Sequence, residues 1–574
     1  MATKSVPARE TTMATHAINI TKGGYCSESR TFHSPRPPAT PPPPTSLSPS
    51  PISSSLSSTP PPSPPPPPPT STSPPQSLYN LNKNDVSFIL CPPSLHVPIL
   101  YFSLLYLGVT ISPANPLSSN SELTHQIQLS KPKIAFATSQ TAHKLPSFPL
   151  GTILIDSPEF ISLLTQISKR DTSTYPVEVS QSDMAAILYS SGTTGRVKGV
   201  SLTHRNVIAP IAGFQESPAE RDPHAVTLLT MPLFHVFGFF MLINAFRCGK
   251  TLVLMERFDF EQMLKVVERY RVSDVPASPT MILFLLKSDL TNKYDLSSLR
   301  RFLCGGAPLS KEVAEKFKRK FPQGYGLTEA GAVSRMIGPE ESNQHPSVGR
   351  LNPNMEAKIV DPLTGEAIGP GKRGELWLRG PSIMKGYVGD EKETAECLDS
   401  EGWLKTGDLS FFDSDGFLYI VDRLKELIKY KAYQVPPFEL EQLLLSNPEV
   451  ADAAVIPYPD EEAGQIPMAY VVRKPGSKIT EAEIMDSIAK QVAPYKKIRR
   501  VAFISAIPKS PAGKILRRDL VNHALSASYG SEARPERRFL AEAADLLLNI
   551  IYCPNPPQVP MRFSGHVKQQ IHPP

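Results

Sequence analysis

The chain has 574 residues, a formal net charge of +6 and an apolar share of 40%. This length exceeds one ordinary hydrophobic core, so we expect two or more domains of a globular protein. The charge is weak for so long a chain, and no Lys/Arg block is interleaved with aromatics, which argues against a nucleic-acid partner.

The cysteines and the most apolar stretch set the expected environment. Six cysteines are scattered without metal or disulfide spacing, which predicts free thiols in a reducing compartment. The apolar stretch 97–111 contains Pro98 and is shorter than the roughly 20 residues that a transmembrane helix needs. No apolar h-region marks a secretory signal. We therefore expect no integral membrane segment.

The first eighty residues give little pattern for a fold. Residues 1–34 form a polar N-terminal segment without periodicity, and residues 35–80 are low-complexity sequence dominated by Pro, Ser and Thr. Such a composition cannot bury enough apolar area to offset its ordering entropy. We expect 35–80 to be disordered or polyproline II.

Strands alternate with helices from residue 85 to about 270, which is typical of α/β layers built on parallel strands. Gly108 is the expected C-cap of the first helix. Apolar runs predict strands at 86–90, 134–136, 152–155, 184–189, 225–230 and 251–254, and apolar periodicity predicts helices at 95–107, 121–129, 234–246 and 260–270.

Beyond residue 355 the predicted strands become shorter and are separated by glycines, as at 374–378 and 416–421. After a boundary near 422–425 we predict a small α/β unit with helices 437–445 and 481–491 and strands 450–455, 468–472 and 501–503. The expected fold class is α/β, with a large multi-layer N-terminal domain over 81–424, a small α/β C-terminal domain over 425–526 and a divergent tail over 527–574. Residues 539–551 of the tail predict a loosely docked helix.

One stretch after the strand 184–189 has the composition of a phosphate site: Ser190-Ser191-Gly192-Thr193-Thr194-Gly195-Arg196-Val197-Lys198-Gly199. Its glycines let the backbone approach a ligand, while hydroxyls and Lys198 add donors and a positive charge. These groups together hold phosphate oxygens well. The Walker A spacing is absent, and a mobile Gly/Ser turn is the alternative interpretation.

Four further motifs follow in order: Gln323-Gly324-Tyr325-Gly326-Leu327-Thr328-Glu329, Thr406-Gly407-Asp408, Asp422-Arg423-Leu424-Lys425 and Pro511-Ala512-Gly513-Lys514. With the loop they resemble the motifs of adenylate-forming enzymes that activate acyl and aryl acids. Within that superfamily the chain is similar to plant 4-coumarate–CoA ligases, especially the ligase-like, often peroxisomal branch. The resemblance covers roughly 85–526, and 24–38 is similar to the family's usual opening.

The resemblance implies an ATP-dependent carboxylate–CoA ligase. ATP would convert the acid to an acyl-adenylate with release of pyrophosphate, and the CoA thiol would then displace AMP. The implied cofactors and co-substrates are ATP, Mg²⁺ and CoA, and the partner is a small-molecule carboxylic acid of fatty/oxylipin or 4-coumarate type. The resemblance gives a cytoplasmic or peroxisomal location, although the C-terminal Ser-Lys-Leu signal is absent; it leaves the oligomeric state open.

The resemblance also assigns nucleotide contacts. The loop would hold the β- and γ-phosphates, Thr328 the α-phosphate, Asp408 with Arg423 the ribose, and Glu329 the Mg²⁺ ion. The implied ATP/AMP-binding residues are Ser190, Ser191, Gly192, Thr193, Thr194, Gly195, Lys198, Gly305, Gly306, Ala307, Gln323, Gly324, Tyr325, Gly326, Thr328, Asp408 and Arg423.

Catalytic residues follow from the same resemblance: Lys514, His235, Lys429 and Gln434. Lys514 would bridge the substrate carboxylate and the α-phosphate and so neutralise two anions that are forced together. Read without the resemblance, Lys514 is a solvated surface charge and His235 a core histidine. Lys431 and Ala432 would contact CoA. Because Lys514 and Lys431 cannot both face one site, the small domain is expected to swing about a hinge at Lys425 between half-reactions.

The implied acyl pocket differs from that of hydroxycinnamate enzymes. Those enzymes read a phenol with a tyrosine after the histidine and a lysine before the Gly-Ala pair, and this chain has Phe237 and Leu303 there, with Phe240 beyond. Apolar side chains cannot hydrogen-bond a phenolic hydroxyl, which favours fatty or oxylipin-type acids over cinnamates.

The chain also departs from the family pattern. The Pro/Ser tract replaces part of the first layer of the large domain, about five residues are missing between Pro322 and Gln323, and the tail replaces the usual ending. The shortened segment would remove the strand that delivers the 323–329 motif. Two alternatives therefore stay open: a luciferase-like adenylating oxygenase, which shares these motifs, and a damaged ligase without turnover.

Overall fold

The computed structural model describes residues 24–27, 29–36, 81–166, 177–191, 197–214, 222, 224–306, 322–344, 346–431, 433–510 and 513–529. Several predictions lie outside these residues. They are the structure of 37–80, the glycines and threonines of the loop at 192–195, Ala307, Ala432 and the helix predicted at 539–551. The described residues up to Arg517 belong to one compact unit, and the described residues 518–529 belong to a second.

The first sheet carries the start of the phosphate loop. Its strand order is β19-β8-β7-β4-β3-β5-β6, with β3 (Val86–Leu90), β4 (Thr110–Pro113), β5 (Ile134–Ala137), β6 (Thr152–Leu154), β7 (Met184–Ser191), β8 (Val197–Thr203) and β19 (Gly386–Tyr387). Strands β3 to β7 are parallel, whereas β8 and β19 join antiparallel. The loop therefore connects two antiparallel strands, a pairing that the alternation of strands and helices did not predict.

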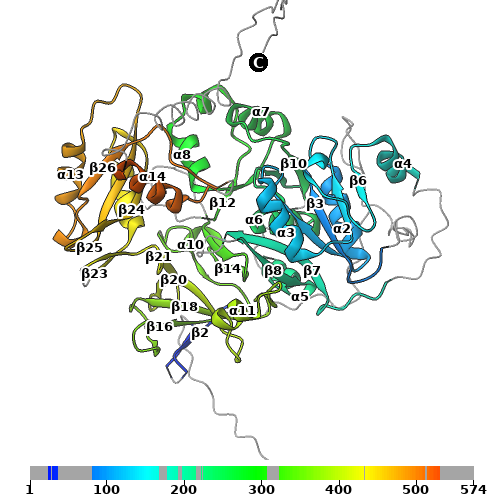
Figure 1. Cartoon of the computed structure of the whole chain (residues 1–574), viewed down its shortest axis with the longest axis horizontal. Helices are drawn as coiled ribbons and strands as arrows, with labels where there is room; N and C mark the ends of the chain where they lie inside the picture. The colour runs from blue at the N-terminus through cyan, green and yellow to red at the C-terminus, as the bar shows by residue number, and fades with distance from the viewer. Residues whose placement is uncertain are drawn as a thin grey trace, which may run out of the picture. The chain divides into compact units, whose positions relative to one another are not determined.

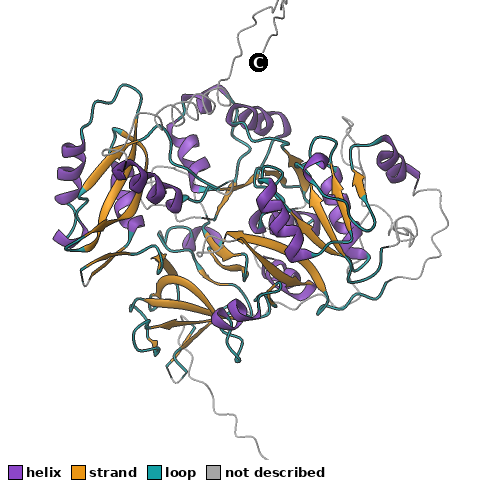
Figure 2. Ribbon diagram, viewed as in Figure 1, coloured by secondary structure: helices purple, strands orange, loops and turns teal. Residues whose placement is uncertain are grey.

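Helices beside this sheet bury its apolar strands (Figures 1 and 2). They are α2 (His96–Tyr106), α3 (Asn120–Ser130), α4 (Pro158–Gln166) and α5 (His204–Gly213). Gly108 has a φ of +68°, as expected for the cap after α2. Ser119 begins α3 with a capping box to Glu122. In the described part of the chain, no helix combines the length and apolar character needed to cross a membrane.

A second, parallel sheet has the order β10-β9-β11-β12, formed by β9 (Val226–Leu229), β10 (Thr251–Leu254), β11 (Asp274–Ala277) and β12 (Arg301–Cys304). Its helices are α6 (Val236–Arg247), α7 (Phe260–Tyr270) and α8 (Pro279–Lys287). Beyond β12, Gln323 forms an isolated parallel bridge with Cys304, and Cys304 N donates to Pro322 O at 3.1 Å. The 323–329 motif is thus anchored beside β12 despite the short connection.

This motif opens a small antiparallel sheet of β13 (Gly324–Leu327), β14 (Gly331–Arg335) and β15 (Arg350–Leu351). A Cβ on Gly326 would lie 2.5 Å from Gly331 O, so the turn that follows β13 requires glycine there. Short helices α10 (Gly338–Glu341) and α11 (Glu391–Cys397) and the 3₁₀ turns η1 (Ala142–Lys144), η5 (Asp289–Lys293) and η6 (Pro494–Lys496) complete the connections.

A third sheet is antiparallel and includes the N-terminal segment. It follows the order β1-β2-β16-β18-β20-β21, with β17 beside β16. The strands are β1 (Tyr25–Cys26), β2 (Thr31–His33), β16 (Glu356–Val360), β17 (Ala367–Ile368), β18 (Gly374–Arg379), β20 (Leu404–Phe412) and β21 (Leu418–Arg423). Strands β1 and β2 were not predicted, because strands of two and three residues are too short to show a periodicity.

Phe32 and Arg36 fix this N-terminal segment to the rest of the large domain. The ring of Phe32 is 1% exposed and stacks on Phe412 with centroids 4.0 Å apart. The Arg36 guanidinium donates to Glu341 at 2.9 Å and to Arg335 O at 2.6 Å. Disorder was expected from residue 35 onward. Residues 35 and 36 are nevertheless among the described residues, and Arg36 is held by acceptors far along the chain.

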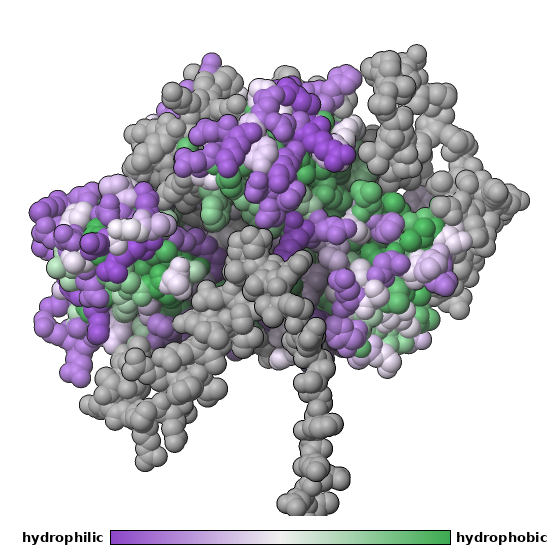
Figure 3. Space-filling view, turned by 90° about the horizontal axis from the view of Figure 1, so that it is seen from above, coloured by the Kyte–Doolittle hydropathy of each residue, from purple (hydrophilic) through white to green (hydrophobic). Residues whose placement is uncertain are grey.

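The last sheet belongs to the C-terminal part. Its order is β23-β22-β25-β24, with β26 parallel to β25. It consists of β22 (Ile428–Tyr430), β23 (Tyr433–Val435), β24 (Val450–Asp460), β25 (Gly464–Arg473) and β26 (Arg500–Phe503), with helices α12 (Pro437–Ser446) and α13 (Glu481–Ala489). The final described helix is α14 (Arg517–Tyr529). On the face shown in Figure 3, hydrophilic side chains cover much of the described surface, with apolar ones between them.

We predict that Phe32→Ala destabilises the large domain by about 3–5 kcal/mol, because it removes a buried ring and leaves a cavity beside Phe412. The measurement is the unfolding free energy in urea. Leu363→Ala is the control, since Leu363 is 92% exposed and its loss should change stability by less than about 0.5 kcal/mol. Equal effects of the two substitutions would contradict the packing of residues 24–34 on this sheet.

Candidate active site

A cleft of ≈ 210 Å³ lies where three predicted site residues meet, Tyr325, Asp408 and Lys514. Its walls come from β13, β20, β21, α12 and the turn before Arg517. Gly306, Gln323, Gly324, Gly326 and Arg423 also line it. Segments that are far apart in the sequence, from Gly306 to Lys514, thus line one cleft.

Asp408 is the buried centre of this cleft. The residue is 4% exposed and sits opposite Arg423 in the register of β20 and β21. The Tyr325 hydroxyl donates to Asp408 Oδ2, and Arg423 Nε lies 3.4 Å from Oδ1. Burial raises the pKa of Asp408, while Arg423 and the Tyr325 hydrogen bond oppose that rise. Tyr325 and Arg423 thus hold the Asp408 carboxylate, an acceptor with two oxygens, in a buried position.

Lys514 extends into the cleft from a tight turn. Lys514 N donates to Ser510 Oγ at 3.1 Å, and Ser510 N donates to Lys514 O at 2.7 Å. Its Nζ lies 3.9 Å from Glu426 Oε1. Burial lowers the pKa of Lys514, the charge of Arg423 lowers it further, and Glu426 and Asp408 act in the opposite direction. A desolvated cation beside two acids can stabilise incoming anions strongly.

The phosphate loop is described only at its ends, where it meets Glu329. Ser190 Oγ donates to Glu329 Oε1 at 2.9 Å, and the Tyr387 hydroxyl donates to the same oxygen at 3.1 Å. Lys198 pairs with Glu393 on α11, and its Nζ lies 4.7 Å from the centroid of the Tyr387 ring. Hydroxyl donors on Oε1 leave Oε2 as the oxygen that can turn toward a cation. Thr328, next to Glu329, is buried.

The predicted acyl-pocket residues lie near the start of α6 and at the end of β12. His235 caps α6, with Phe237 N donating to its Nδ1 at 3.3 Å. The ring of Phe237 lies beside Gly305, 3.5 Å from the position that a Cβ would take there. Phe240 is buried, and Leu303 packs partly buried against the same core. Burial lowers the pKa of His235 to about 4, so the imidazole is neutral near pH 7.

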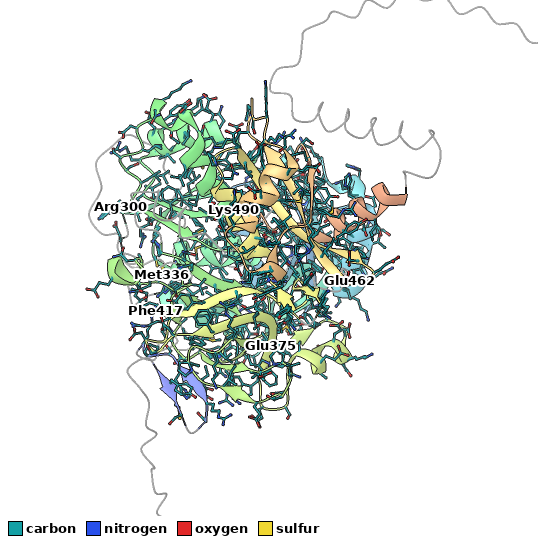
Figure 4. All side chains as sticks on the ribbon, turned by 90° about the vertical axis from the view of Figure 1, so that its left-hand side faces the viewer. Arg300, Met336, Glu375, Phe417, Glu462 and Lys490 are labelled. Atoms are coloured by element: carbon teal, nitrogen blue, oxygen red, sulfur yellow. The ribbon has the colours of Figure 1, made fainter. Side chains whose placement is uncertain are left out.

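The remaining predicted residues lie apart from the cleft that holds Lys514. Lys429 and Gln434 face each other across β22 and β23, and both are exposed. Lys431 has a φ of +51° and its Nζ lies 2.7 Å from Glu462, which is labelled in Figure 4. Lys425 is exposed. The structure thus brings Lys514 to Asp408 and leaves the predicted CoA-binding lysine elsewhere.

The motifs did not point to several residues that contact this site. Tyr387, Glu393, Glu426, Glu441 and Arg517 all contact or line it. Arg517 donates to both Glu441 oxygens at 2.8 Å and lies 3.0 Å from Glu426. Among these residues, only Glu426 and Arg517 could have been suspected from the sequence, because they lie close to the 422–425 and 511–514 motifs.

Two family models match the chain: "AMP-binding enzyme" over residues 77–388 and "AMP-binding enzyme C-terminal domain" over residues 439–514. The chain belongs to the AMP-binding enzyme family. The first match contains the phosphate loop and Glu329, and the second ends at Lys514, whereas Asp408 and Arg423 lie between the two matches.

Plant relatives share most of the chain. 4-Coumarate–CoA ligase-like 9 of Arabidopsis thaliana is 61% identical over 460 residues, which are 78% of this chain and 82% of that protein. Peroxisomal OPC-8:0-CoA ligase 1 of the same plant is 46% identical over 466 residues, 78% of this chain and 85% of that protein. The expected class of activity, ATP-dependent and AMP-forming ligation of an acid to CoA, is confirmed.

Solved structures agree with this family. ATP-bound MatB from Rhodopseudomonas palustris superposes with a TM-score of 0.72 at 25% identity, covering 78% of this chain and 90% of that chain. O-succinylbenzoate coenzyme A synthetase (MenE) from Bacillus subtilis, in complex with ATP and a magnesium ion, gives 0.66 at 27% identity, covering 77% and 90%. The expected α/β fold class is confirmed.

We predict that the buried, neutral His235 makes folding sensitive to acid. Its pKa is about 4 in the folded protein and ordinarily near 6.5, so between these values the unfolded chain binds the proton and the folded one does not. The stabilisation is therefore complete above pH 6.5 and is lost as the pH falls, by about 2 kcal/mol at pH 5.

His235→Asn tests this, because asparagine can still cap α6 but does not titrate. Between pH 7.5 and pH 5 the unmodified protein should lose about 2 kcal/mol more unfolding free energy than the variant in urea titrations. Parallel pH profiles of the two proteins would show that the pKa of His235 is the same in the folded and the unfolded protein, which would contradict the prediction.

Proposed function

We propose that the cleft around Asp408 activates a fatty or oxylipin-type carboxylic acid as its adenylate, and that CoA then takes the acyl group. The observation that carries this proposal is the position of Lys514 in the same cleft as Asp408, Tyr325 and Arg423. An acyl-adenylate needs a cation near its phosphate, an acceptor with two oxygens for its ribose hydroxyls, and open space bordered by glycine for its flat base. The cleft offers all three.

The residue roles follow from the charges in the cleft. Asp408, oriented by the Tyr325 hydroxyl and Arg423, accepts hydrogen bonds from the two ribose hydroxyls. Adenine lies against Tyr325 and the Gly305-Gly306 backbone. The Lys514 ammonium sits between the carboxylate of the acid and the α-phosphate and offsets their repulsion as the carboxylate oxygen attacks phosphorus. Pyrophosphate leaves toward Ser190 and Lys198 at the ends of the phosphate loop.

Glu329 fits a magnesium ion that enters with ATP. Magnesium prefers one or two carboxylates together with substrate phosphates, and Glu329 carries one carboxylate beside the phosphate loop. The hydroxyls of Ser190 and Tyr387 orient this carboxylate through Oε1. The ion would supply neutralisation of charge on the phosphates. Thr328, adjacent to Glu329, would reach the α-phosphate.

The second half-reaction needs a different face of the small domain. Lys431 contacts Glu462 outside the cleft in this structure, so CoA contacts by Lys431 and Ala432 require residues 426–517 to turn about Lys425. Lys429 and Gln434 would come to the site by the same rotation. His235, neutral at the start of α6, would lie where the thiol meets the acyl group.

The compartment is proposed from likeness alone. One relative is named as peroxisomal, and we propose a peroxisomal or cytoplasmic location for this chain. Partners are the acid, ATP and CoA. Imaging of a fluorescent fusion, tagged at either end in separate trials, distinguishes the two compartments.

We predict that Lys514→Ala lowers adenylate formation by about 10²–10³-fold while AMP binding changes little, because the lysine acts on charge that develops between acid and phosphate. The assay incubates the protein with ATP, Mg²⁺, CoA and a panel of acids, and follows AMP, pyrophosphate and thioester. Lys478→Ala, at an exposed position that does not line the cleft, is the control and should keep most activity. Unchanged AMP release by Lys514→Ala would refute the role of the lysine.

We predict that long-chain or oxylipin acids exceed 4-coumarate in kcat/KM, since Phe237, Phe240 and Leu303 give a phenol no hydrogen-bond partner. The double variant Phe237→Tyr with Leu303→Lys should raise the relative preference for 4-coumarate by about 10-fold or more. Phe284→Tyr, at an exposed site, is the matched control. A preference of the unmodified protein for 4-coumarate would overturn the substrate assignment.

A further inference from the structure

The N-terminus of helix α12 is capped by an acceptor that lies outside the C-terminal sheet and its helices. Its cap residue, Pro436, has no side-chain acceptor, and Pro437 has no N–H to donate. The first N–H of the helix is that of Phe438, and it donates to Asp422 Oδ2 at 3.0 Å. Asp422 lies on β21, in the antiparallel sheet that also holds Asp408, whereas α12 packs on β24 of the C-terminal sheet. The predicted hinge, Lys425, lies between donor and acceptor.

Asp422 is well placed to cap the helix. Its other oxygen, Oδ1, accepts from Arg423 N at 2.8 Å, so each carboxylate oxygen serves one N–H. The residue is 7% exposed, and burial raises the pKa of its carboxyl group to about 6 while Arg517 opposes the rise. A carboxylate at a helix N-terminus satisfies a bare donor and interacts favourably with the helix dipole.

The cap is linked mechanically to Lys514. Glu441 lies one turn along α12 from Phe438. Its carboxylate accepts a hydrogen bond from Val455 N at 2.8 Å, and both of its oxygens accept from Arg517 Nη2. Arg517 follows Lys514 by three residues and also lies 3.0 Å from Glu426. Any movement of α12 away from β21 therefore carries the Lys514 turn with it.

The opposite side of the cap is linked to the ribose site. Arg423, next to Asp422 on β21, reaches Asp408 at 3.4 Å. One short strand end thus carries both the arginine of the nucleotide site and the acceptor that holds α12. The spacing between Lys514 and Asp408 depends on this junction.

We propose that Asp422 is a positioning residue for the first half-reaction: its cap on α12 docks the small domain in the arrangement that places Lys514 beside Asp408. This inference rests on the proposed function and on rotation about Lys425. Bringing Lys431 to the site requires the bond from Phe438 N to Asp422 to break, so the cap favours adenylation and does not serve thioester formation.

The test measures the two half-reactions separately in Asp422→Ala. The rate of adenylation, measured as the exchange of labelled pyrophosphate into ATP, should fall about 5–30-fold. This is the range expected for the loss of one helix cap. Thioester formation from supplied acyl-adenylate and CoA should stay within about two-fold of the unmodified protein or rise. Asp422→Asn keeps one acceptor for two N–H groups and should give an intermediate fall in adenylation.

Thr480→Ala is the matched control, since Thr480 caps α13 from within the C-terminal domain. It should lower the melting temperature without separating the two half-reactions. An equal loss of both half-reactions in Asp422→Ala, or unchanged adenylation, would overturn the proposal.

Hydrogen exchange gives a readout that needs no turnover. In Asp422→Ala, peptides covering 437–442 and 513–517 should exchange faster, while β24 and β25 should be unchanged. Unaltered hydrogen exchange at both peptides would refute the docking role of Asp422, even if the variant protein is active. Failure of the unmodified protein to form adenylate with any acid would refute the proposed function, while faster exchange at these peptides would still support the docking role of Asp422.

Discussion

The cleft depends on the burial of one carboxylate, Asp408. A charge so poorly exposed is costly unless donors surround it, and here Tyr325 and Arg423 supply them from two other strands. The same burial gives Lys514, which belongs to the small domain, a low-polarity environment in which its charge acts strongly. Sheet register, the 323–329 turn and the position of the C-terminal domain all contribute to this one arrangement.

Glu329 organises the phosphate end in a comparable way. It receives hydroxyls from Ser190 before the phosphate loop and from Tyr387 on β19, while Met384 N donates to its main-chain oxygen at 2.8 Å. Strand β19 pairs with β8, which follows the loop, so Tyr387 links that end of the loop to Glu329 while Ser190 links the other end directly. The phosphate and ribose ends of the site are therefore built on different sheets and joined by the short 323–329 segment.

Departures from the family pattern had raised the question whether this scaffold could support the motifs. At the shortened segment, Gln323 pairs with Cys304 beside β12, and β13 begins at the next residue, Gly324. At the N-terminus, β1 and β2 complete the antiparallel sheet through Phe32. Phe32 contacts Ala357 and Phe412, which are far from it along the chain, and local sequence patterns do not record such contacts.

Local sequence patterns were enough to predict the long elements, the family and the residue types of the site. Apolar periodicity predicted α2, α3, α6 and α7 within one or two residues at most ends, and ordered motifs predicted which side chains carry charge. Other features became visible only in the folded chain: the antiparallel pairing of β7 with β8, the contacts of Tyr387 and Arg36, and the cap that Asp422 gives to α12. Periodicity reports which face of an element is buried, whereas partners across sheets and domains depend on how the chain folds back in three dimensions.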